Sequence, residues 1–159
     1  MFDIAQQMSV AAAENKTRRV LVLMAQKDKV EMEDAIAEKM PKNSPVRIIC
    51  RSGDPTSLND LAMANVGAAK AVIVVSPDDG NPDARNLKTI LALTQAASDQ
   101  KNPRAVVAEF RDSANVEAVH AIGGAGVQAV MADDLISRII VHSSRQIGIV
   151  SGVFRSARL

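Results

Sequence analysis

The chain has 159 residues, of which 47% are hydrophobic and 23% are charged, and its formal net charge is +1. This length suits one domain with a sizeable core, and we expect a single domain over residues 1–159. Nucleic acid is excluded as a partner, because the chain lacks the charge for a basic face and has three Phe but no Trp or Tyr for base stacking. No run approaches the roughly 18–20 apolar residues that span a bilayer, so we expect a soluble chain.

The cysteine and histidine content excludes disulfides and the common zinc motifs. Cys50 is the only cysteine and lies in an apolar run, which favours a buried, inert thiol in a reducing, cytoplasmic compartment. His120 and His142 have no nucleophile and acid at motif spacing. Glu109 lies at the end of an apolar run and could face a ligand edge. A single carboxylate does not by itself provide a catalytic mechanism. We therefore expect a protein that is not an enzyme.

Short apolar runs rich in Val and Ile recur along the chain without clean alternation of polar and apolar residues. This pattern favours parallel strands that are covered on both faces. The predicted strands are Val20–Ala25, Val46–Cys50, Ala71–Ser76, Ala105–Phe110 and Val127–Met131.

Helical stretches lie between these runs. Leu87, Ile90, Leu91 and Thr94, for example, recur at the spacings of an amphipathic helix. The predicted helices are Lys29–Met40, Thr56–Ala64, Ala84–Ser98, Asn115–Ile122 and Asp133–Arg145, and the tail Ile147–Leu159 contains a possible short strand. The alternation predicts an α/β fold with a doubly wound, Rossmann-like parallel sheet.

Turn residues support these boundaries. Asp54 or Thr56 is a candidate cap for the helix after the second strand, and Asp83 is a candidate cap after Asn81 and Pro82. The glycine-rich stretch Gly123–Gly126 follows a predicted helix and precedes a strand, so it predicts a helix end with a tight connector.

Polar residues follow four of the predicted strands, at the edge where ligands bind in open parallel sheets. The residues that we predict to contact a ligand are Asp28, Gly53, Asp54, Ser76 and Asp78, with Asp79 as an additional cation ligand. The effector would be a divalent cation, held by carboxylate oxygens, or a nucleotide such as NAD, whose ribose or adenine hydrogen-bonds Asp28 or Asp54. Gly53 would leave room for its approach. The alternative is that these aspartates only cap helices and start turns.

Several stretches together resemble the CASTOR/POLLUX ion channel family. The stretch Ile48–Pro55, read as IICRSGDP, is similar to the family's C-R-S-G-x-P strand end, and Asp83–Arg85 matches its D-A-R helix start. Further matches are Ala71–Pro77, Gln26–Glu33, Ile122–Gly124 and Ala132–Arg138, and the similarity runs in consistent order over roughly residues 1–148. More distantly, Gly53 and Asp54, followed by a strand and an acidic turn, resemble the TrkA-N (RCK) nucleotide-sensing domains of potassium transport.

The resemblance implies a ligand-sensing and assembly domain of a bacterial cation channel. Such domains form a homo-oligomeric gating ring on the cytoplasmic face of the cell membrane, beneath the pore domain of the full-length channel. The family also has a strand with a glycine turn before Phe2, and this chain departs from the family there and after about Ile147. We therefore expect Met1 to be an internal methionine of a longer protein.

The first strand of a Rossmann-like sheet lies in its centre, in the order 3-2-1-4-5-6. Its absence predicts two unpaired edges in the middle of the sheet. We expect either another chain or the segment Ile147–Phe154 to compensate. Two other functions stay open: a fragment of an NAD-dependent oxidoreductase, opposed by the lack of a substrate domain, and a scaffold without a ligand.

Overall fold

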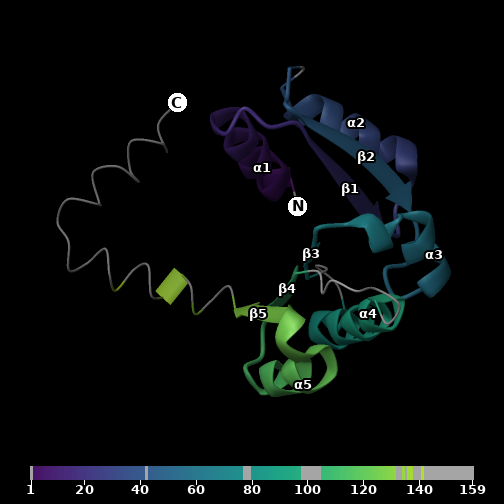
Figure 1. The fold of residues 1–159 in the computed structure, drawn as a ribbon, viewed down its shortest axis with the longest axis vertical. Coiled ribbons are helices and arrows are strands. Elements are labelled where there is room, and N and C mark those ends of the chain that lie inside the picture. The colour runs from purple at the N-terminus through teal and green to yellow at the C-terminus, as the bar shows by residue number, and fades with distance from the viewer. Residues whose placement is uncertain are drawn as a thin grey trace.

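The computed structural model describes residues 2–41, 43–76, 80–97 and 105–131, together with Asp134, Ile136, Ser137 and Val141. Strands and helices alternate along these residues as the sequence predicts, and every paired strand is parallel to its neighbour (Figure 1). The predicted α/β class is therefore confirmed.

The first part of the fold is a strand pair with helices α1 and α2. Strand β1 (Arg19–Ala25) pairs with β2 (Val46–Ser52) over its whole length. Helix α2 (Lys29–Lys39) connects them, and α1 (Phe2–Glu14) precedes them. The inner face of α1 carries the small buried residues Ala5, Ser9 and Ala12, and the Ser9 hydroxyl lies 2.9 Å from that of Ser44. These small side chains let α1 lie close to the segment that leads into β2.

The second part is a sheet of three strands, in the order β3-β4-β5. Its central strand β4 is buried: Ala108 and Phe110 have exposed fractions of 0% and 1%. Ile90 and Val119 from two helices complete this aliphatic core. The elements of this part are α3 (Leu58–Met63), a 3₁₀ turn (Val66–Ala68), β3 (Ala71–Val74), α4 (Pro82–Ala97), β4 (Ala105–Phe110), α5 (Ala114–Gly123), a 3₁₀ turn (Gly124–Gly126) and β5 (Val127–Met131).

The two sheets are not hydrogen-bonded to each other in the described part of the chain. Their orders, β1-β2 and β3-β4-β5, fit a doubly wound sheet in which none of the described strands lies between β1 and β3. Within the described residues, β1 and β3 therefore each have one edge without a strand partner.

Two predicted helix caps are wrong. Helix α3 begins at Leu58 with Ser57 as its cap, because the Asp54 carboxylate is engaged in a turn with Thr56 instead. At α4 the side chain of Asn81 accepts the hydrogen bond from the Ala84 amide, at 3.1 Å. Asp83 lies inside the first turn of α4 and points its carboxylate toward the loop after β4.

The inward face of α4 differs from the predicted one. Ile90 is fully buried, but Leu91 has an exposed fraction of 48%, and Leu93 is buried in its place. The stretch Gly123–Gly126 ends α5 as predicted, with Gly124 at φ 59°. The predicted tail strand within Ile147–Leu159 and most of the helix Asp133–Arg145 lie outside the described residues, and the four residues described in that helix are helical.

Candidate ligand site at the carboxyl edge of the strands

The carboxyl ends of β1 and β2 lie beside the start of α4. Gln26 directly follows β1, and its side-chain oxygen accepts a hydrogen bond from Arg85 in the first turn of α4. The positive charge of Arg85 also acts on Asp54, which follows β2. The backbone amide of Gly53 donates to the carbonyl of Ala25 at 3.0 Å, which holds the two strand ends together. One polar edge therefore joins both sheets.

Asp54 forms a tight turn with Thr56. Its Oδ1 accepts hydrogen bonds from the amide and the hydroxyl of Thr56, both at 2.8 Å. These two bonds, assisted by Arg85, lower the pKa of Asp54 below its ordinary value. The turn accounts for one role of Asp54, and it holds the ionised carboxylate at the edge.

The space beside Gly53 is occupied by the protein itself. A Cβ atom at this position would lie 3.2 Å from the Cβ of Asp60. Oδ2 of Asp60 accepts a hydrogen bond from the Asp54 amide at 2.7 Å. The glycine thus makes room for Asp60, and room for a ligand at Gly53 remains only a prediction.

Asp28 caps helix α2. Its Oδ1 accepts hydrogen bonds from the amides of Val30 and Glu31, at 2.8 and 3.2 Å, and the residue is exposed. Asp28 therefore has the helix-capping role that the sequence analysis gave as the alternative to ligand binding. Its side chain is exposed, and a contact with a ligand stays a prediction.

Ser76 and Glu109 connect the ends of β3 and β4. The Ser76 amide donates to Oε2 of Glu109 at 3.0 Å. The amide group of Asn86, whose exposed fraction is 2%, donates to the Glu109 carbonyl at 2.7 Å and to the Ser76 hydroxyl at 3.2 Å. Glu109 thus reaches the carboxyl edge as expected, and Ser76 lies there too, held by a buried helix side chain.

Asp83 ties α4 to the loop after β4. Its carboxylate accepts from the amides of Arg111 and Asp112, each at 3.0 Å, and from the side chain of Asn115 at 2.7 Å. Burial acts to raise the pKa of Asp83, but these hydrogen bonds together outweigh burial, so the pKa is lowered. Asp83 is therefore an ionised carboxylate whose hydrogen bonds hold α4 against the segment that follows β4.

The structure brings Asp54 and Ser76 to one edge together with residues that sequence reasoning did not select, namely Gln26, Arg85 and Asn86. Only the D-A-R resemblance pointed toward Arg85. Asp78 and Asp79 lie outside the described residues. Within the described residues no group of three or more His, Cys, Asp or Glu side chains is placed to hold a metal ion.

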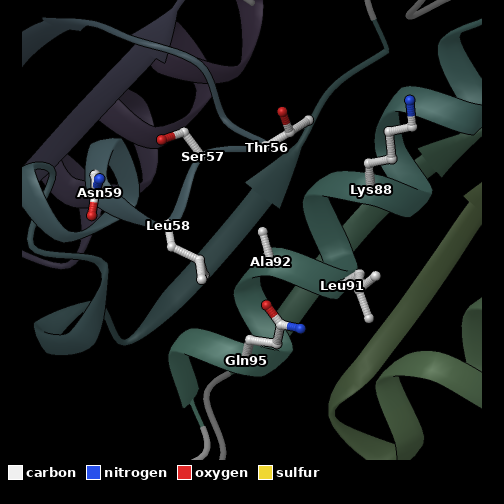
Figure 2. A pocket seen from close by; sticks show the side chains of 8 residues that line it. All are labelled: Thr56, Ser57, Leu58, Asn59, Lys88, Leu91, Ala92 and Gln95. Atoms are coloured by element: carbon white, nitrogen blue, oxygen red, sulfur yellow. The ribbon is translucent and has the colours of Figure 1, made fainter.

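A hollow of about 560 Å³ lies next to this edge, between the start of α3 and the outer face of α4 (Figure 2). Thr56 and Ser57 line one side, and Lys88 and Leu91 line the other. None of the predicted ligand residues lines the hollow, although Thr56 is the hydrogen-bond partner of Asp54.

Parallel strands, connecting helices and a polar carboxyl edge define a Rossmann-like domain. The NAD(P)-binding domain of an exopolyphosphatase-related protein from Archaeoglobus fulgidus has a similar structure: the TM-score is 0.51 at 12% identity, over 82% of this chain and 98% of that one. At this identity the likeness shows the fold alone. No family model matches the chain.

In sequence the chain is similar to one segment of the CASTOR/POLLUX ion channels. It is 39% identical over 132 residues to the probable ion channel CASTOR of Oryza sativa subsp. japonica, covering 81% of this chain and 14% of the channel. The probable ion channel POLLUX of Arabidopsis thaliana is 36% identical over 132 residues, covering 82% of this chain and 16% of the channel. The chain therefore spans only about a seventh of these relatives. The predicted resemblance to this family is confirmed.

Among the described residues, no helix is both long and apolar enough to cross a bilayer.

Proposed function

We propose that this chain is a ligand-sensing regulatory domain of a cation channel. The observation that carries the proposal is the convergence of Gln26, Asp54 and Arg85 at one edge of a Rossmann-like domain, in a chain related to ion channels. A ligand bound at this edge favours one packing of neighbouring domains over another. The pore responds only to that difference in affinity.

The described residues favour a nucleotide over a divalent cation as the ligand. Arg85 supplies a positive charge for phosphate oxygens, and Asp54 is held ionised as an acceptor for hydroxyl or amino groups. Asp28, Gly53, Ser76 and Asp78 remain proposed contacts. A cation site would need carboxylates beyond those that the described residues bring together.

Titration calorimetry of the chain with NAD, ATP, calcium and sodium tests this proposal. We expect heat with a nucleotide, and a loss of affinity of about tenfold in Asp54→Asn, because the amide oxygen of Asn can keep the turn with Thr56 while the charge is removed. Asp3→Asn, in the first turn of α1, is the matched control and should bind as the parent does.

Two outcomes of the titration contradict the proposal. The absence of heat and of thermal stabilisation with every ligand would favour a scaffold without an effector. Binding of NAD accompanied by hydride transfer to a substrate would favour the fragment of an oxidoreductase.

If the chain is part of a channel, it has protein partners as well as a ligand. We expect the domain to self-associate, to act on the pore domain of the full-length channel, and to lie on the cytoplasmic face of the membrane. Sedimentation of the full-length protein with and without the nucleotide tests the assembly, and a monomer under both conditions would contradict it. The relatives named above are plant proteins, so a bacterial source stays a prediction.

A further inference from the structure

The hollow between α3 and α4 has walls that the core holds in place. Helix α3 contributes Leu61 to the core and α4 contributes Ile90 and Leu93, and these side chains have exposed fractions of 5%, 0% and 2%. The start of α3 is fixed as well, because the Ser57 hydroxyl accepts a hydrogen bond from the Asp60 amide at 3.4 Å. Small-molecule sites are usually formed before the ligand arrives, and the hollow meets this condition.

Two large apolar side chains that line the hollow are only half covered. Leu58, at the start of α3, has an exposed fraction of 46%, and Leu91 of α4 has one of 48%. In Figure 2 the side chain of Leu58 points from α3 toward the face of α4 that carries Ala92. Apolar atoms placed in the hollow would remove water from both leucines, which is favourable. The hollow therefore suits a ligand with an apolar body.

The rest of the lining is polar and carries one charge. Lys88 is exposed, and within the described residues no carboxylate lies at ion-pair distance from its ammonium group. None of the described lining residues is acidic, and the other polar ones are neutral: Thr56, Ser57, Asn59 and Gln95. A single positive charge beside apolar side chains is balanced best by a monovalent anion, because a second negative charge would be partly desolvated without a partner.

The lining residues of α4 set the length of such a ligand. Lys88 and Gln95 are seven residues apart on one face of this helix, which corresponds to about 10 Å along its axis. Leu91 and Ala92 lie between them and line the hollow too. The volume of about 560 Å³ is that of an ordinary small-molecule site. The ligand is therefore a small molecule that is longer than it is wide.

We propose that the hollow binds a small carboxylate with an apolar body, whose carboxylate group pairs with Lys88 and whose body lies between Leu58 and Leu91. This site does not depend on the proposed function, because none of the proposed contacts of the regulatory ligand lines the hollow. Thr56 nevertheless connects the two sites. It lines the hollow, and its amide and hydroxyl each donate to Oδ1 of Asp54 at 2.8 Å. A ligand in the hollow would therefore contact the turn that holds Asp54.

Titration of the nitrogen-15-labelled chain with hexanoate, followed by NMR, tests the proposal. We expect saturable shifts of the Leu58, Lys88 and Leu91 amides, with a dissociation constant of about 5 mM for a ligand of this size. Lys88→Met removes the charge and keeps a long side chain, and it should weaken binding about fivefold. The matched control is Lys70→Met, because Lys70 is exposed and does not line the hollow. This variant should bind as the parent chain does.

Two other probes separate the charge of the ligand from its apolar body. Hexanol has the same body without the charge, and inorganic phosphate has charge without the body. Each should bind about fivefold more weakly than hexanoate. Leu91→Ser should also weaken the binding of hexanoate, because it removes one apolar wall. The amide spectrum of each variant reports whether the fold is intact.

Each other outcome overturns the proposal. The absence of saturable shifts at these amides would show that the hollow binds no carboxylate. Equal affinity of the parent chain and Lys88→Met would exclude the ion pair. Equal affinity for phosphate would identify an adventitious ion only, and equal affinity for hexanol would identify an apolar surface only. Hexanoate shifts confined to Gln26 and Arg85 would place the carboxylate at the carboxyl edge and leave the hollow empty. Failure of the hollow is distinct from failure of the proposed function, which the nucleotide titration measures separately.

Discussion

Asp83 connects the first turn of α4 to the loop after β4. Its exposed fraction is 5%, and it accepts three hydrogen bonds from the segment that leads from β4 into α5. We expect Asp83→Ala to lower the free energy of unfolding by about 2–4 kcal/mol, because buried donors lose their acceptor. Urea denaturation measures this change.

The control for Asp83 is Asp3→Ala. Asp3 is exposed in the first turn of α1, and its loss should cost only about 0.5 kcal/mol through the helix dipole. Equal effects of the two substitutions would show that the contacts of Asp83 contribute nothing specific.

The lowered pKa of Asp83 and of Asp54 makes stability depend on pH in acid. A carboxyl whose pKa is lower in the folded state contributes stability above its ordinary pKa of 3.8, and this contribution is lost as the pH falls through the folded value. We therefore expect the free energy of unfolding to fall below about pH 4. The fall should be smaller in Asp83→Asn, and an identical slope in parent and variant would contradict this.

At the residue scale, the sequence predicted the local role of Asp28 but not the caps of α3 and α4 or the tertiary contacts of Asp83. Asp28 was foreseen as a helix cap or a ligand contact because both roles follow from its place after a strand. The role of Asp83 was missed, because its partners Arg111 and Asn115 are far away in the sequence. Spacing along the chain does not show such contacts.

At the scale of elements, the turn from β2 into α3 depends on the absence of a side chain at Gly53. We expect Gly53→Ala to destabilise the chain by about 1–2 kcal/mol, because its Cβ would displace Asp60 from 3.2 Å and weaken the bond to the Asp54 amide. Thermal and urea denaturation measure the loss.

A double-mutant cycle isolates this effect. In an Asp60→Ala background, the methyl group added at position 53 no longer contacts the Asp60 carboxylate. Gly53→Ala should therefore lower the free energy of unfolding less than it does in the parent chain. Additive costs would mean that the glycine is required for its backbone conformation and not for Asp60.

The strands were predicted well because Val- and Ile-rich runs are a strong local signal. β4 has the predicted bounds, whereas β3 ends at Val74, two residues before the predicted Ser76. Helix α1 was not predicted at all, since its buried face consists of small residues such as Ala5 and Ala12, which give little contrast with the other face. Such a face is visible only once the helix is seen against the segment that precedes β2.

At the scale of the whole molecule, the two described sheets meet at the proposed ligand edge. The space between β1 and β3 ends where Gln26 and Arg85 meet. A ligand in this position would contact both parts of the fold and change how they are held together. This provides a physical route from occupancy to the packing of domains in an assembly.

The most direct test of the account is a nitrogen-15 NMR titration of the chain with NAD, followed by ATP and calcium. The account predicts shifts of backbone amides that cluster at the carboxyl edge, around Gln26, Asp54, Ser76 and Arg85. An absence of shifts with all three ligands, or shifts confined to the hollow lined by Lys88 and Leu91, would contradict it.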